Sequence, residues 1–139
     1  MIKEIVKDEA VLSQPCAVAT AEDATVAQDL LDTIASLDDA ACLAANQIGE
    51  TVCIAVYLDE NENPCVMYNP VIKRALRPVR TVEECLSRDT ESRVTRFEKI
   101  TVGFDELVDG ELVARTKEFQ GWIAQLIQHN IDHCKGKLV

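Results

Sequence analysis

Two stretches of the chain place apolar residues at the spacing of an amphipathic helix. The first, residues 22–37, follows Thr20 and an acidic first turn, which suit a helix N-terminus. Its apolar stripe is formed by Val26, Leu30, Ile34 and Leu37. The second stripe is formed by Phe119, Trp122, Ile123, Leu126, Ile127 and Ile131. Gly121 lies inside this second helix, and Gly136 lies where a left-handed residue would end it.

Between these helices, short apolar runs alternate with polar turns, which is typical of β-strands. The predicted strands cover residues 51–58, 64–72 and 94–104. Asp109-Gly110 predicts a hairpin between Leu107-Val108 and Leu112-Val113. Residues 5–18, interrupted by Pro15, predict an irregular N-terminal arm. The pattern indicates an α+β fold with mostly antiparallel strands, and the length of 139 residues predicts a single domain over 1–139.

Composition narrows the possible partners. The chain is 47% hydrophobic and 27% charged, as is usual for globular proteins that dissolve in water. Its net charge of −10 argues against sequence-independent binding of nucleic acid. No segment is long and apolar enough to span a membrane, and the N-terminus does not resemble a signal or transit peptide. We therefore expect a cytoplasmic protein without nucleic-acid or membrane partners, and the sequence leaves its oligomeric state open.

The chain has six cysteines, and their spacing includes no CxxC pair. In a cytosolic protein they are expected to be reduced thiols. Cys53 and Cys65 lie in apolar runs, so we expect them to be small core residues.

The two histidines of the chain, His129 and His133, are four residues apart in the second predicted helix. This spacing stacks both imidazoles on one helix face, where they can bind a single metal ion. In the related HExxH motif, the residue after the first His is the Glu that takes a proton from the attacking water. Here that residue is Asn130. A third ligand would be a Cys, Asp or Glu elsewhere, and spacing alone does not choose among them.

Three segments resemble, in the same order, the motifs of the peptide deformylase family. Gln128-His129-Asn130-Ile131-Asp132-His133 resembles QHExDH. Glu83-Glu84-Cys85-Leu86-Ser87 resembles EGCLS, and Ala40-Ala41-Cys42-Leu43-Ala44-Ala45-Asn46-Gln47 resembles GxGLAAxQ. The resemblance runs over essentially the whole chain. It implies the peptide-deformylase-like α+β fold, with mixed or antiparallel strands around a central helix that carries metal ligands.

The resemblance also implies roles for individual residues. Cys85 would complete a metal site with His129 and His133. Ferrous iron would be the native ion, with zinc, nickel or cobalt able to replace it, and this donor set suits those metals rather than magnesium or calcium. Gln47, through its side-chain amide, and Leu86, through its backbone N–H, would stabilise the oxyanion formed at the formyl carbon.

Glu83 and Asp132 are candidates for the oxygen that accepts the second N–H of a ligating histidine. For Asp132, a solvent-facing charge on the helix is an alternative interpretation.

The departures from the family motifs bear on activity. Asn130 can orient a water but cannot take its proton, and loss of a general base costs about 10²–10⁴-fold in rate. Ala40 and Cys42 replace glycines and are expected to narrow the cleft, and Glu84 replaces the glycine beside Cys85. One interpretation is that these residues compensate for the missing Glu, with Glu84 acting as the base or Cys42 approaching the metal. The other, which we favour, is that the substitutions accumulated in a homologue that is no longer under selection for deformylase activity.

These observations predict a metal-dependent hydrolase that removes N-formyl groups from formyl-methionyl peptides, with activity reduced by Asn130. The alternative is an impaired homologue that binds metal and peptide-like ligands or acts on another substrate. A weaker alternative is a metal-free structural homologue. The chain ends at Val139, soon after His133, so we expect no room for the further C-terminal segment that contacts the ribosome in some bacterial members.

Overall fold

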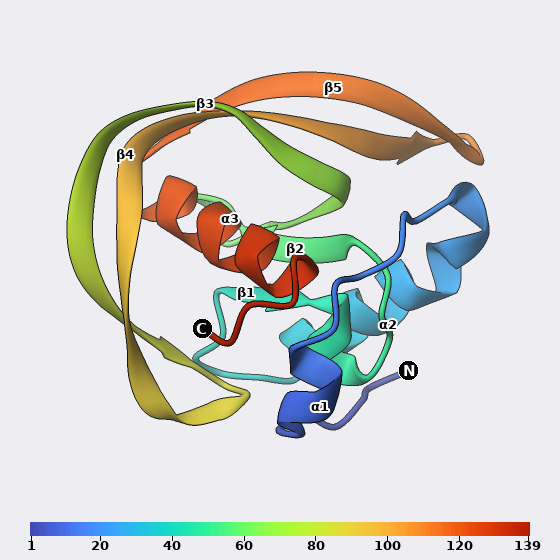
Figure 1. Ribbon diagram of the computed structural model, residues 1–139. Helices are drawn as coiled ribbons and strands as arrows, with labels where there is room; N and C mark the ends of the chain where they lie inside the picture. The colour runs from blue at the N-terminus through green and yellow to red at the C-terminus, as the bar shows by residue number, and fades with distance from the viewer.

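The computed structural model places one helix inside a strongly curved antiparallel sheet (Figure 1). It describes residues 1–139, apart from the side chain of Asp89. In chain order the elements are α1 (Glu9–Leu12), η1 (Ala21–Asp23), α2 (Ala24–Ala35), β1 (Cys42–Ala44), η2 (Ala45–Ile48), β2 (Ile54–Leu58), β3 (Pro64–Cys85), β4 (Arg88–Val108), β5 (Glu111–Gln120) and α3 (Gly121–Cys134). The predicted α+β class is confirmed. No helix among the described residues is long and apolar enough to cross a membrane.

The five strands lie in the order β1-β2-β3-β4-β5, and each pairs antiparallel with the next. The long β3–β4 hairpin curves around α3 and carries its turn back toward the end of that helix (Figure 1). Register shifts between Tyr68 and Val71 and between Ile72 and Arg74 allow β3 to bend, because bulged strands kink and twist more strongly. A third shift, between Glu83 and Cys85, lies at the hairpin end. The bending therefore brings the end of β3 to α3.

The core has two halves, which lie on opposite faces of the sheet. Side chains along a strand alternate between faces, so consecutive residues of β2 enter different halves. Val56 belongs to the cluster that contains Leu30 of α2, and Tyr57 belongs to the cluster that contains Ile127 and Ile131 of α3. As a result α3 is fixed against the inner face of the sheet.

The helix predicted over residues 22–37 is confirmed as η1 followed by α2, with Thr20 and Asp23 forming a capping box at its start. The strands are longer than predicted: β3 continues to Cys85 and β4 begins at Arg88. Residues 73–80 are mostly exposed, so the apolar alternation that marks a strand is weak there. The short strand β1 was not predicted, and the N-terminal arm contains the short helix α1.

The prediction that Gly121 lies inside the second helix was wrong. Gly121 is the first residue of α3 and has φ +66°, and Phe119 belongs to β5. A Cβ on Gly121 would meet nothing within 4 Å, so the backbone turn from strand to helix is what favours glycine here. Gly136, with φ +77°, follows the C-cap of α3, which confirms its predicted place at the helix end.

Replacing Gly136 with Ala is expected to lower the free energy of unfolding by at least about 2 kcal/mol. A Cβ at this position would lie 2.6 Å from the backbone carbon of Gln14 and 2.7 Å from the carbonyl oxygen of Ser13. Gly110→Ala is the matched control: Gly110 has φ +84° but open space around it, so it tests backbone strain alone. Urea denaturation measures both variants, and equal losses would contradict the proposed clash.

Candidate metal centre

The site begins with the orientation of α3. The Gln128 side chain bonds to both backbone groups of Phe97 on β4: its Oε1 accepts from N at 2.8 Å, and its Nε2 donates to O at 2.8 Å. This pair of bonds fixes the rotation of the helix against the sheet. His129 and His133 then lie buried on one face, with ring centroids 4.7 Å apart and Nε2 atoms 3.0 Å apart.

Cys85, at the end of β3, brings a thiol to the two imidazoles. Its Sγ lies 3.3 Å from His133 Nε2. Among the described residues, this is the one group of three metal-binding side chains whose ligand atoms all lie within 4.8 Å of one another. Donors about 2.0–2.3 Å from a tetrahedral ion are roughly 3.3–3.7 Å apart. The Cys85–His133 separation of 3.3 Å falls in this range, and the 3.0 Å between the two Nε2 atoms lies just below it. The structure thus brings together the three residues predicted as ligands.

Behind the histidines lies a buried network of charges. Glu83 Oε1 is 2.9 Å from His129 Nδ1, and the same carboxylate accepts from Arg96 Nε and Nη2 at 2.8 and 2.7 Å. Gln125 donates a further hydrogen bond to Glu83 at 2.9 Å. Arg96 Nη1 also donates to Asp132 at 2.6 Å. Glu83 therefore contacts a predicted ligand directly, whereas Asp132 is joined to the network through Arg96 rather than facing solvent alone.

The network sets the charges around the site. Burial raises the pKa of Glu83, but the hydrogen bonds from His129 and Arg96 outweigh it and hold that pKa at about 2. Burial disfavours the charged form of His129, yet Cys85 and Glu83 raise its pKa to about 9. Burial and then the charge on His129 lower the pKa of His133 to about 3. Binding of an ion at His129 must therefore release a proton, which makes metal affinity weaker at lower pH.

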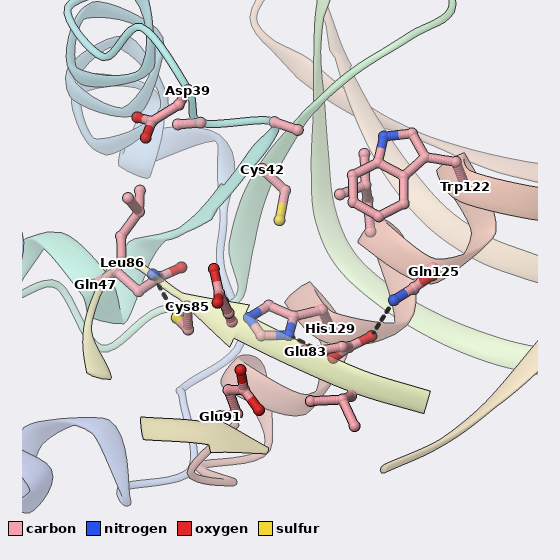
Figure 2. Close-up of a pocket in the computed structure, with 15 residues that line it drawn as sticks. Asp39, Cys42, Gln47, Glu83, Cys85, Leu86, Glu91, Trp122, Gln125 and His129 are labelled. Atoms are coloured by element: carbon pink, nitrogen blue, oxygen red, sulfur yellow. Dashed lines mark hydrogen bonds and ion pairs between the residues drawn. The ribbon is translucent and has the colours of Figure 1, made fainter. Parts of the chain in front are cut away.

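Gln47 presents its amide to the site from η2. Its Oε1 accepts from the Ala44 backbone N–H at 2.9 Å, which turns its Nε2 toward Cys85 Sγ at 3.3 Å (Figure 2). The same Nε2 lies 3.3 Å from Ser87 Oγ. A side-chain donor fixed in this way suits the predicted oxyanion role. Leu86, whose backbone N–H is the other predicted donor, lines the same cavity.

Asn130 lies on α3 beside the first histidine and is buried. Its Nδ2 donates to the carbonyl oxygen of Val56 on β2 at 3.1 Å. Its Oδ1 is also buried, and no described residue forms a hydrogen bond with it. The fixed amide therefore has one acceptor without a partner among the described residues, and an amide cannot take a proton.

A cavity of about 540 Å³ opens above the centre. Figure 2 shows Cys42, Trp122, Gln125 and His129 around it, with the Cys42 sulfur directed inward. Ala40 and the exposed Glu84 also line this cavity. The three residues that stand where the family motifs have glycine, Ala40, Cys42 and Glu84, are therefore all cavity-lining residues. Burial, followed by the charges of Cys85 and Glu83, raises the pKa of Cys42 to about 12, which keeps its thiol protonated at neutral pH.

Sequence reasoning missed several contributors to the site: Ser87, Arg96, Trp122 and Gln125. Arg96 gave no distinct signal, because the predicted strand 94–104 also carries Glu98 and Lys99 and nothing in the pattern shows which of these charges is buried. Trp122 belongs to the predicted apolar stripe, which indicates a core position, but its side chain is exposed at the cavity. Gln125 is a polar residue beside that stripe, and nothing in the pattern marked it. Ser87 is part of a motif already identified, but nothing in its type indicated a contact with Gln47.

Known proteins resemble this chain in sequence and in fold. A family model described as polypeptide deformylase matches residues 2–139. A peptide deformylase of Clostridium beijerinckii is 39% identical over 140 residues, which cover all of both chains. The crystal structure of peptide deformylase from Thermus thermophilus is 30% identical with a TM-score of 0.84, over 99% of this chain and 83% of that one. A class I type b peptide deformylase from Acinetobacter baumannii shares the fold, with a TM-score of 0.85, 24% identity and coverage of 99% and 97%. This chain belongs to the polypeptide deformylase family.

Proposed function

We propose that the protein hydrolyses the N-formyl group of formyl-methionyl peptides, at a rate limited by Asn130. The observation that supports this most strongly is the convergence of Cys85, His129 and His133 beside a cavity that Cys85 and His129 line. In a cytoplasmic setting, the substrates would be newly made polypeptides. Membership of a hydrolase family supports the reaction class.

The donor set fits a transition metal, with ferrous iron as the proposed native ion and zinc, nickel or cobalt as substitutes. A bound ion would polarise the formyl carbonyl and lower the pKa of the attacking water. Cys85 and the two histidines would hold it, and Glu83 would orient His129 through the Nδ1 contact of 2.9 Å.

The remaining residues act on the substrate and the water. Gln47 Nε2, held by the Ala44 contact, would donate to the oxyanion together with the Leu86 N–H. Asn130 Oδ1, the free end of an anchored amide, would accept a hydrogen bond from the water and orient it. Since an amide is not a base, the proton must leave to solvent or to another group, and the reaction is slower than with a carboxylate.

The second candidate function is binding without turnover, and Asn130 is the observation that favours it. A centre that holds metal and peptide but lacks a base would retain formyl-peptides rather than hydrolyse them. Ala40 and Cys42 in the cavity would then select a different peptide-like ligand.

Metal analysis and an activity assay together test the proposal. Purified protein is expected to contain a stoichiometric transition-metal ion and to hydrolyse formyl-Met-Ala-Ser slowly. Cys85→Ser replaces the thiolate ligand with a hydroxyl. It should weaken metal binding by more than the roughly 10–100-fold that is lost when a residue hydrogen-bonded to a metal ligand is removed. Cys65→Ser is the matched control, because Cys65 is a half-buried thiol outside the centre. A protein free of metal, or unchanged metal content in Cys85→Ser, would contradict the assignment. Metal without any turnover would favour the second candidate.

A further inference from the structure

Three cysteines outside the metal centre meet at the C-terminal end of α3. Cys16 comes from the N-terminal arm, Cys53 precedes β2, and Cys134 is the last residue of α3. The backbone holds them together: Cys16 N–H donates to Cys134 O at 2.9 Å, and Cys53 N–H donates to Ala17 O at 2.9 Å. Cys53 Sγ also lies 3.4 Å from Cys16 O. We call these three residues the thiol cluster.

The members of the thiol cluster differ in access to solvent. Cys134 is buried, whereas Cys16 and Cys53 are half-buried, and all three are free thiols. Cys53 was predicted to be a core residue, but it is only half-buried and belongs to neither of the two core clusters. Cys53 and Cys16 are therefore more accessible to a small oxidant from solvent than Cys134 is.

Cys53 is the central thiol. Its sulfur interacts with the thiols of Cys134 and Cys16, and these two contacts hold the pKa of Cys53 below its ordinary value. A thiol with a lowered pKa is more often present as the thiolate, which is the form that reacts with peroxides.

The geometry favours a pairwise reaction rather than a second metal site. Among the described side chains, only Cys85, His129 and His133 bring three ligand atoms within 4.8 Å of one another. The thiol cluster does not meet that condition. A disulfide needs just two sulfurs from neighbouring backbones. The backbone of Cys53 is hydrogen-bonded to Ala17, the residue after Cys16, and that of Cys16 is hydrogen-bonded to Cys134.

We propose that the thiol cluster is a site of reversible oxidation, in which Cys53 forms a disulfide with one of its two flanking thiols, Cys134 or Cys16. The co-reactant is a hydroperoxide such as hydrogen peroxide. The Cys53 thiolate attacks one peroxide oxygen, which breaks the O–O bond and gives a sulfenic acid and hydroxide. The second thiol then attacks the sulfenic sulfur, and the S–O bond breaks with release of water. In total two thiols and one hydrogen peroxide give one disulfide and two waters.

This reaction would occur next to the metal centre without using its thiolate. Cys134 directly follows His133, and Cys16 Sγ lies 4.0 Å from the His133 carbonyl oxygen. Cys85 contacts the other side of the same residue, at His133 Nε2.

The test is peptide mapping of metal-loaded protein after brief exposure to hydrogen peroxide and alkylation of the remaining thiols. Trypsin leaves Cys16, Cys42, Cys53 and Cys65 in one peptide, because residues 8–72 contain no Lys or Arg. A protease that cuts after acidic residues separates them, since Glu22, Glu50, Glu60 and Asp132 lie between the cysteines of interest. We expect loss of the mass of two hydrogens, recovery with dithiothreitol, and a linked peptide that contains Cys53.

Variants check the central position of Cys53. Cys53→Ser should abolish the disulfide, whereas Cys16→Ser and Cys134→Ser should each retain it with the other flanking thiol. Cys65→Ser should behave like the unchanged protein. A disulfide that lacks Cys53, or oxidation that reaches only Cys85, would overturn the proposal. The map of the unchanged protein gives this answer even if a variant fails to fold.

Discussion

Replacing Asn130 with Glu is expected to raise kcat for formyl-Met-Ala-Ser by about 10²–10⁴-fold, the usual contribution of a positioned general base. The side chain follows His129 on α3, and Asn130 Oδ1 is buried with no hydrogen-bond partner within the described part of the chain. A carboxylate there can take the proton of the attacking water. The substitution also removes the donor to Val56 O, so we expect stability to fall by about 1 kcal/mol while activity rises.

Asn130→Gln is the matched control, because glutamine has the length of glutamate but no basic group. A gain in Asn130→Glu that is absent in Asn130→Gln assigns the effect to the base. If both variants are silent, the cavity residues Ala40 and Cys42 become the obstacle, and binding without turnover is favoured. Glu84→Gln tests compensation in the native chain: a lowered rate would show that the exposed Glu84 carboxylate supplies the missing base.

The local patterns predicted the helices of the fold better than its sheet. The period of the apolar residues identified both main helices, since each buries one face. The length of the β3–β4 hairpin was underestimated because residues 73–80 of β3 are mostly exposed. This part of the hairpin is held by strand pairing between residues far apart in the chain. Such pairing leaves little trace in hydrophobic alternation. Strand β1, which is three residues long, is too short to show a period at all.

The sequence motifs predicted the three candidate metal ligands, but they did not predict the buried charge network around them. The spacing of His129 and His133 predicted a shared helix face from helix geometry alone. Cys85 required the family resemblance, because no local rule connects the end of β3 to α3. Arg96 lies outside the motifs and reaches Glu83 across the paired strands β3 and β4. It reaches Asp132 on α3 because the hairpin curves around that helix. Contacts made by folding at long range are the part that local patterns cannot give.

Replacing Arg96 with Met is expected to lower the free energy of unfolding by about 3–5 kcal/mol, the usual cost of removing one partner from a buried ion pair. Arg96 and Glu83 have side chains only 8% and 5% exposed, so the carboxylates of Glu83 and Asp132 would lose their common cation in a buried place. Because Glu83 orients His129, metal affinity should also fall by roughly 10–100-fold.

Arg77→Met is the matched control for this prediction. Arg77 pairs with Glu98 at 3.0 Å, but both side chains are more than half exposed, and such pairs contribute about 0–1 kcal/mol. Urea denaturation at several pH values measures both variants. The pKa of Glu83 is depressed to about 2, so its stabilising effect is complete above its unfolded pKa of about 4.3 and is lost as the pH falls toward 2. Arg96→Met should lose much of that pH dependence and Arg77→Met should keep it, and equal behaviour of the two variants would show that the buried network does not stabilise the fold.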